Sequence, residues 1–315
     1  MSIPSAGLRI QGYTLMALCV SLSLGWTLMV VALHAYQCLA QEAKRAHQKM
    51  QDGFVFRELW QFLHNDLRFA PYLGPRTQDP RFVIYNQVSL AAKPWFKSDR
   101  LLWGCYPAHA DCARVLAPLE ARLKTRADVL LIYHVPKWCS RLSQGMRSPE
   151  DALQLQNTDS VLPGSLVLIA DAWQADLVMA SSVHATRIMH AQTPYSNRSA
   201  ALSKNYELGT ELCVLETVAY YVGRPKRART DSDLFSVYRA NLFQKSEEII
   251  EGVVTFEIEY QFLDANFNAQ FKKAWMIRDR EWPQVRGFRL SVVLQSGAKW
   301  HYAFQMPQGL NRAIP

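Results

Sequence analysis

The 315-residue chain lacks low-complexity stretches and internal repeats. Their absence excludes an intrinsically disordered protein and an array of repeated modules. Local signatures of catalysis are missing as well: there is no Gly-x-Ser-x-Gly turn, no His-Glu-x-x-His motif, no glycine-rich phosphate loop and no Cys-x-x-Cys pair. The eight histidines are scattered, and His134, within an apolar run, is expected to be a core residue. We therefore expect no enzymatic activity and no cofactor.

Charge is absent from a long segment near the N-terminus. No Asp, Glu, Lys or Arg occurs between Arg9 and Glu42, and the 24 residues from Tyr13 to Tyr36 also lack Pro and Asn. At about 1.5 Å per residue, a helix of this length exceeds a hydrocarbon thickness of about 30 Å. A secretory signal would be shorter and would be followed by a small-x-small cleavage site. Here the one candidate processing residue, Gly12, precedes the run, so cleavage would leave the membrane helix in place.

Helical periodicity continues beyond this segment. The first apolar stripe is narrow and comprises Leu39, Ala43, Ala46 and Met50. After Gly53, a candidate bend, the stripe is wider and more aromatic, as expected where a helix packs on a domain: Phe56, Leu59, Trp60, Leu63 and Leu67. Pro71 should end the helix. The expected divisions are a leader (1–12), a membrane-spanning half-helix (13–36), an amphipathic half-helix (37–70) and a β-rich head (71–315).

Strand patterns dominate the head from residue 127 onward. Seven segments are expected to be strands: 128–135, 165–171, 177–181, 213–222, 234–239, 252–263 and 287–295. Residues 186–207 and 266–282 are expected to be long loops, 72–125 irregular with a short helix at 116–123, and the tail after Met306 poorly ordered. The sequence thus predicts an α+β fold in which a long N-terminal membrane-spanning helix packs on a C-terminal antiparallel β-sheet head.

The six cysteines fall into two groups. Cys19 and Cys38 are separated by 19 residues of helix, roughly 28 Å, and cannot pair within one chain. The other four, Cys105, Cys112, Cys139 and Cys213, allow three connectivities. An exported head would lie in an oxidising compartment, and there the short Cys105–Cys112 loop is the favoured pair, with Cys139–Cys213 second. The spacing Cys105-x3-His109-x2-Cys112 also suits three metal ligands, but no fourth is evident nearby, so we expect no metal site.

The net charge is +8, and its densest basic cluster is Arg224, Lys226, Arg227 and Arg229. The cluster contains Pro225 and follows a strand-like run, which favours a solvated hairpin loop. The alternative is a candidate anion-binding loop that attracts DNA or lipid headgroups. No aromatic residues are interleaved with the basic ones as base stacking would require, so DNA is the weaker alternative.

The segment Gln11-Gly12-Tyr13-Thr14-Leu15 and the apolar helix after it resemble the type IV prepilin signature, which type II secretion pseudopilins share. The resemblance narrows to the PilW-like minor pilins. Four groups of motifs carry it in the family's order: 52–56 with 63–74, 165–177, 220–223 with 234–239, and 251–260 with 285–294. Each motif alone is weak, but their succession along most of the chain is fairly specific.

This resemblance implies maturation and assembly rather than catalysis. A prepilin peptidase would cut after Gly12 and methylate the new amine of Tyr13, and the apolar helices would then bundle into a filament core. The implied function is a minor pilin that primes or caps a type IV pilus, with adhesion, twitching motility and DNA uptake as consequences. The implied location is the bacterial inner membrane with the head in the periplasm, and the pilus tip after assembly. The implied partners are other minor pilins, the major pilin, a tip adhesin and the inner-membrane assembly platform.

The chain departs from the family pattern in three places. The fifth residue after the cut is normally Glu, which pairs with a neighbouring subunit's amine, and here it is Ala17. A buried charge without a partner is costly, so its absence suits a subunit at the tip, the alternative being drift in a degenerate copy. Ala172 and Trp173 occupy positions where relatives often carry Cys, so the family's disulfide is not transferred. The leader has a single Arg, which leaves the positive-inside rule ambiguous.

Two other functions remain open at this stage. The first is a type II secretion minor pseudopilin, which belongs to the same class of machine. The second is a single-pass anchored periplasmic binding protein or enzyme that never polymerises.

Overall fold

The computed structural model describes residues 10–69, 82–89, 102–106, 112, 127–135, 139–159, 161–193, 196–225, 235–241, 246–264 and 268–306. Side chains are described from residue 15 onward, except those of residues 69 and 283. The chain divides into two compact units, Met1–Phe54 and Val55–Pro315, called here the stem and the head. Each unit is described by itself.

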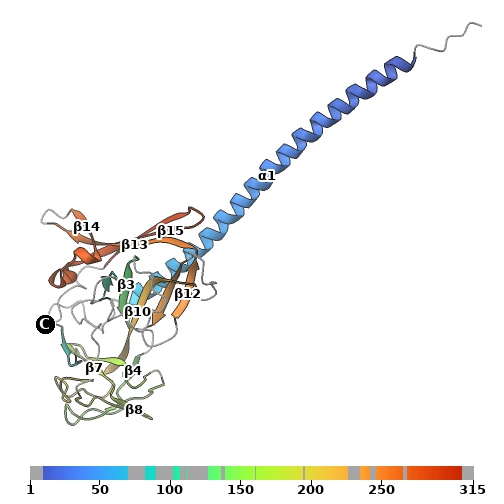
Figure 1. The fold of residues 1–315 in the computed structure, drawn as a ribbon. Helices are drawn as coiled ribbons and strands as arrows, with labels where there is room; N and C mark the ends of the chain where they lie inside the picture. Colours follow the sequence, from blue (N-terminus) through green and yellow to red (C-terminus); the bar gives the residue numbers. More distant parts are fainter. Residues whose placement is uncertain are drawn as a thin grey trace, which may run out of the picture. The chain divides into compact units, whose positions relative to one another are not determined.

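One helix, α1 (Ile10–Phe69), supplies the whole described stem and the first segment of the head (Figure 1). It begins three residues earlier than the sequence pattern predicts, runs through Gly53 without interruption, and ends two residues before Pro71. Every described side chain of the stem is exposed except the half-buried Asp52. The helix is long and apolar enough to cross a membrane once, by length and composition.

The largest sheet of the head has nine strands, and β10 (Glu211–Gly223) is its central member. The first half of β10 pairs with β4 and β6, and its second half pairs with β3 and β11. The strand β1 pairs with β7 in parallel, whereas all other pairs in this sheet are antiparallel. The other strands of the sheet are β1 (Val83–Asn86), β2 (Leu102–Cys105), β3 (Val129–His134), β4 (Cys139–Arg141), β6 (Leu166–Ala170), β7 (Gln174–Met179), β11 (Ser236–Asn241) and β12 (Ser246–Glu251).

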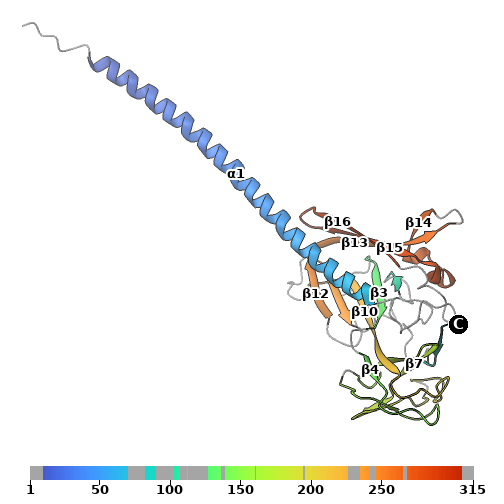
Figure 2. The ribbon, with the colours of Figure 1, turned by 180° about the vertical axis from the view of Figure 1, so that it is seen from behind.

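Two smaller sheets complete the head. A four-stranded sheet has the order β14-β13-β15-β16, and a three-stranded sheet has the order β5-β9-β8. Figures 1 and 2 place them at opposite ends of the head, with β10 between them. The elements are β13 (Val253–Leu263), β14 (Ala269–Lys273), the short 3-10 helices η2 (Ala274–Met276) and η3 (Asp279–Gln284), β15 (Gly287–Leu294), β16 (Lys299–Gln305), β5 (Leu153–Gln154), β8 (Ser182–His184) and β9 (Arg187–Met189).

The main core of the head forms where the last turns of α1 meet both larger sheets. Four residues spaced three or four apart on one helix face are buried and belong to a cluster with side chains of β3, β10, β13 and β15: Phe56, Leu59, Leu63 and Leu67. Burial of each such side chain contributes about 1.5–3 kcal/mol. The C-terminal end of the helix is therefore an integral part of the head.

The structure confirms the α+β class and the seven expected strands, with ends shifted by up to three residues. Several strands were not predicted. The segment 266–282, expected to be a loop, contains β14, η2 and the start of η3, and 186–207 contains β9. The irregular region 72–125 contains β1 and β2. The expected helix at 116–123 and the tail after Met306 lie outside the described residues.

Two of the missed strands, β12 and β14, share a physical reason. β12 reads SEEIIE and β14 reads AQFKK, and both lie at an edge of their sheet. Edge strands carry charges on exposed positions, which removes the regular alternation of apolar and polar residues. Their conformation comes from pairing with β11 and β13, which are strongly patterned.

Candidate functional site

The stem presents a continuous apolar surface. Large apolar side chains are exposed all along it, from Leu15 (69% exposed) through Trp26 (69%) to Tyr36 (71%). A soluble monomer rarely exposes a contiguous apolar surface of this extent, so the surface needs lipid or other apolar helices around it.

The serine and threonine hydroxyls in the described part of this surface are satisfied within the helix. The side chains of Ser21, Ser23 and Thr27 each donate a hydrogen bond of 2.9 Å to the backbone carbonyl three residues earlier. In a medium without water, every polar group must find such an internal partner. The stem is therefore chemically suited to lipid and to a dry helix bundle.

The residues predicted for processing lie at the start of α1. The helix begins at Ile10, so the bond between Gly12 and Tyr13 lies in its first turn rather than before it. Ala17, at the position where the prepilin pattern has Glu, is exposed.

A buried polar cluster fixes the end of α1 to the head, and we call it the clasp: Asp66, Tyr220 and Arg239. Asp66 lies on the buried helix face and is only 4% exposed. The guanidinium of Arg239 (β11) donates two hydrogen bonds to it, Nε to Oδ2 at 2.8 Å and Nη2 to Oδ1 at 2.8 Å. The hydroxyl of Tyr220 (β10) donates to the same Oδ2 at 2.5 Å. One carboxylate thus joins the helix to two adjacent strands.

Strand register positions the two partners of Asp66. Tyr220 and Arg239 are directly opposite each other in the antiparallel β10–β11 pair, so their side chains point to the same face. The hydrogen bonds that Arg239 donates to Asp66 raise the pKa of its guanidinium further, and burial raises the pKa of Tyr220 well above 10. Both groups therefore keep their protons throughout the ordinary pH range and remain donors.

A second polar group lies beside the clasp. His134 (β3) is directly opposite Glu216 (β10) in the sheet, with 3.9 Å between His134 Nε2 and Glu216 Oε2. Neither ring nitrogen of His134 has a hydrogen-bond partner among the described residues. Burial lowers the pKa of His134 and raises the pKa of Glu216, whose carboxylate accepts a hydrogen bond from Asn241 at 2.9 Å. His134 is thus a buried residue, as expected, but its ring nitrogens have no hydrogen-bond partner among the described residues.

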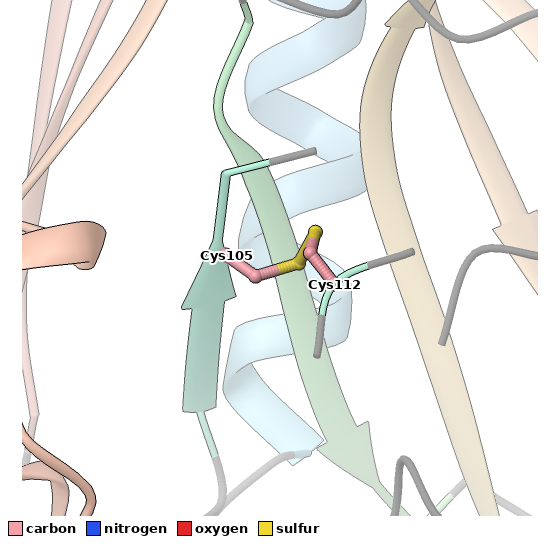
Figure 3. The surroundings of a disulfide bond; sticks show 2 residues. All are labelled: Cys105 and Cys112. Atoms are coloured by element: carbon pink, nitrogen blue, oxygen red, sulfur yellow. A yellow bond between two sulfur atoms is a disulfide. The ribbon is translucent and has the colours of Figure 1, made fainter. Parts of the chain in front are cut away.

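Two disulfides join the head cysteines: Cys105 to Cys112 and Cys139 to Cys213. These are the two pairs that the sequence favoured. Cys105 lies on β2 and belongs with Cys112 to the main core, beside β3 in Figure 3. Cys139 and Cys213 lie directly opposite each other on β4 and β10. Cys19 and Cys38 are free and exposed on α1.

The disulfides remove the sulfur ligands from both cysteine-based metal arrangements. Cys105 and Cys112 are bonded to each other, and His109 lies outside the described residues. Cys139, Glu211 and Cys213 bring three ligand atoms within 4.8 Å of one another, but their two sulfur atoms form the second disulfide. Thiolates are the species that bind zinc, so neither group can serve as a zinc site in this oxidised state.

The basic loop is described only at its start. Arg224 is exposed, and its backbone carbonyl accepts a hydrogen bond from the Tyr238 hydroxyl at 2.8 Å. Lys226, Arg227 and Arg229 lie outside the described residues. The loop therefore stays a sequence-based candidate for anion binding.

The clasp was missed at the sequence level. Asp66, Tyr220 and Arg239 were noted only as members of family-like motifs. One signal was present: Asp66 interrupts the apolar stripe between Leu63 and Leu67, where a lone carboxylate requires a buried partner.

Comparisons with protein-family models, with curated proteins and with solved structures found no match to this chain.

Proposed function

We propose that this chain is a minor pilin of the PilW-like kind, which primes the assembly of a type IV pilus or caps it. The observation that carries the proposal is the make-up of α1. A single helix bears an exposed, charge-free surface with internally satisfied serine and threonine hydroxyls, and its last turns are built into the core of a β-rich head. This is the organisation that a polymerisation stem requires.

The clasp supports the same function because it can transmit force between the head and α1. Extraction of a subunit from the bilayer requires that force on the head reach the stem. The two-pronged pair between Asp66 and Arg239 is directional and largely shielded from water, since the two side chains are 6% and 22% exposed. Charge-assisted bidentate pairs are among the stronger side-chain contacts. The clasp is therefore suited to keep the end of the helix bound to the sheet while force extracts the subunit from the membrane.

Ala17 supports a place at or near the tip. A carboxylate at this position would need an amine from a neighbouring subunit, and an exposed alanine needs none. The partners would be other minor pilins, the major pilin and a tip adhesin, with the prepilin peptidase and the inner-membrane assembly platform acting earlier. Adhesion, twitching motility and DNA uptake would be consequences of the assembled pilus.

Mass spectrometry of the mature N-terminus tests the proposal. We expect the purified native chain to begin at a methylated Tyr13. Gly12→Val should block cleavage and leave the leader attached, because the peptidase needs a small residue there. Gly25→Ala is the matched control: its added Cβ would meet nothing within 4 Å, so processing should be unchanged.

An intact Met1 in the functional chain would contradict the proposal and favour a permanent single-pass anchor. A methylated Tyr13 together with absence from sheared pili and loss of secretion on deletion would favour a type II secretion pseudopilin.

A further inference from the structure

The head has an exposed aromatic and cationic surface at the β14 end of the four-stranded sheet, which we call the η2 patch: Phe271, Trp275, Met276, Arg280 and Arg286. Trp275 and Met276 are consecutive and are 54% and 51% exposed, and Phe271, four residues earlier, is 41% exposed. Both arginines are exposed as well. Figure 1 shows β14 at the edge of the head, on the side away from the small β8 sheet.

The exposed pair is held by a rigid frame. Ala274 and Ile277, which bracket Trp275 and Met276, are 6% and 8% exposed, and the Ile277 amide donates to the Ala274 carbonyl at 3.1 Å. The chain thus anchors itself on both sides and turns two large apolar side chains outward. A surface held in its binding conformation before it meets a partner loses less conformational entropy on binding.

The following segment is anchored as firmly. Trp282 of η3 is buried and packs edge-on against the Tyr260 ring, with 4.8 Å between ring centroids. The exposed arginine of η3, Arg280, therefore projects from a fixed element.

The charges around the η2 patch are unevenly balanced. Three neighbouring cations have carboxylate partners within the head: Lys272 with Glu281, Lys273 with Glu257, and Arg289 with Glu259. Arg280 and Arg286 enter no ion pair in the described part of the chain. The surface therefore offers two arginines near an apolar centre, with which carboxylates of a partner can pair. Trp, Met and Arg are among the side chains enriched in protein interfaces, and Trp and Arg are also enriched in their hot spots.

We propose that the η2 patch is a docking surface for another protein, whose apolar side chains cover Trp275 and Met276 and whose carboxylates pair with Arg280 and Arg286. A lipid surface has similar chemistry in part, but the same segment also carries the carboxylate of Asp279, whereas that of Glu281 is paired with Lys272. An anionic bilayer would repel the Asp279 carboxylate, whereas a protein partner can accommodate both signs. The inference does not depend on the proposed pilin function.

Site-specific photo-crosslinking in the native cell tests the inference. A benzoylphenylalanine replaces Trp275 in the full-length chain, and in a control it replaces Val254, which is 53% exposed on the same sheet at the opposite end of β13. We expect a crosslink to one protein from position 275 and none to that protein from position 254. The crosslinked protein is identified by mass spectrometry and purified for binding measurements with the full-length chain.

The binding measurement uses three variants. Trp275→Ala with Met276→Ala, and Arg280→Glu with Arg286→Glu, should each weaken binding by about tenfold or more, as hot-spot substitutions do. Lys299→Glu, exposed at the far end of β16, should change it less than about twofold. Unchanged circular dichroism shows that the variants are folded.

Crosslinking to lipid or to a second copy of this chain, equal crosslinking from both positions, or no loss of affinity in the variants would overturn the inference. A partner that meets the criteria but lacks a prepilin-like helix would uphold the η2 patch and count against the pilin proposal alone.

Discussion

Asp66 of α1 and Arg239 of β11 form a two-pronged ion pair across a sequence separation of 173 residues. Both N–O distances are 2.8 Å, and the Tyr220 hydroxyl completes the coordination of the carboxylate. The pair lies within the head, between the last turns of the helix and the largest sheet. It adds a directional polar contact to the apolar packing of the helix and so defines the axial position of the helix.

Removal of the carboxylate should destabilise the head strongly. Asp66→Ala leaves the Arg239 guanidinium and the Tyr220 hydroxyl without their acceptor in a largely buried place, and loss of one partner of a buried pair typically costs about 3–5 kcal/mol. We expect a loss of about 3 kcal/mol in the free energy of unfolding, measured by urea titration of the full chain in detergent with near-ultraviolet circular dichroism.

Arg289→Ala is the control for the clasp. It breaks a more exposed ion pair with Glu259, and such pairs contribute about 0–1 kcal/mol. If Asp66→Ala costs no more than this control, the clasp does not hold the helix.

Acidification should weaken the head through His134. Burial places the pKa of His134 below its ordinary value of about 6.5. The unfolded chain therefore takes up a proton at higher pH than the folded chain, so stability is full above about pH 6.5 and is lost as the pH falls toward the lowered folded pKa. His134→Phe should remove this loss, which urea titrations between about pH 8 and 5.5 would measure.

The neighbouring carboxyl acts in the opposite direction. Burial raises the pKa of Glu216 above that of the unfolded chain, so its protonation favours the folded state as the pH falls. The difference between the parent chain and His134→Phe isolates the histidine contribution. An identical pH profile for His134→Phe and the parent would contradict the prediction.

Two buried tyrosines should respond oppositely to removal of their hydroxyl groups. The Tyr260 hydroxyl is buried without a hydrogen-bond partner among the described residues, whereas that of Tyr220 donates to Asp66. Tyr260→Phe should be neutral or stabilising by up to about 1 kcal/mol, because an unsatisfied group is removed. Tyr220→Phe should cost about 1.5–3 kcal/mol, the usual contribution of a hydrogen bond to a charged group. Thermal unfolding of both variants and of the parent chain tests this prediction. A lower unfolding temperature for Tyr260→Phe would show that the Tyr260 hydroxyl has a hydrogen-bond partner.

Much of the fold could be predicted because its signals are local. The charge-free run and the apolar stripe of α1 predicted the helix nearly to its ends, and the alternation in β13 predicted that strand within one residue. The edge strands β12 and β14 could not be predicted in this way, since their conformation depends on pairing with distant partners.

The same distinction between local signals and long-range pairing applies to the candidate site. The apolar stem is a composition signal and was predicted. The clasp depends on the register of β10 against β11, which sets Tyr220 opposite Arg239, and on which turn of α1 crosses that pair. A lone Asp66 in an apolar stripe indicates that a buried partner exists, but no periodicity tells which of the 35 Lys and Arg residues it is.

Relief of backbone strain should stabilise the small sheet. Ala185, at the β8–β9 turn, has a φ of 46°, in the left-handed region, where a side chain costs roughly 1–2 kcal/mol. Ala185→Gly should therefore raise the free energy of unfolding by about 0.5–1 kcal/mol, after the greater flexibility of glycine in the unfolded chain is counted. Ala191→Gly, exposed and outside the positive-φ region, should lower it, and stabilisation by both changes would contradict the strain argument.

The two disulfides should contribute unequally because they close loops of different length. The sequence separations are 7 residues for Cys105–Cys112 and 74 for Cys139–Cys213. Chain-entropy estimates give about 2.5 kcal/mol for the short loop and about 4.5 kcal/mol for the long one. Replacement of Cys139 and Cys213 by Ala should thus destabilise the head by about 2 kcal/mol more than the same replacement of Cys105 and Cys112. Urea titration of both double variants measures the difference, and a larger loss from the short loop would mean that core packing around Cys105 and Cys112 outweighs the loop entropy.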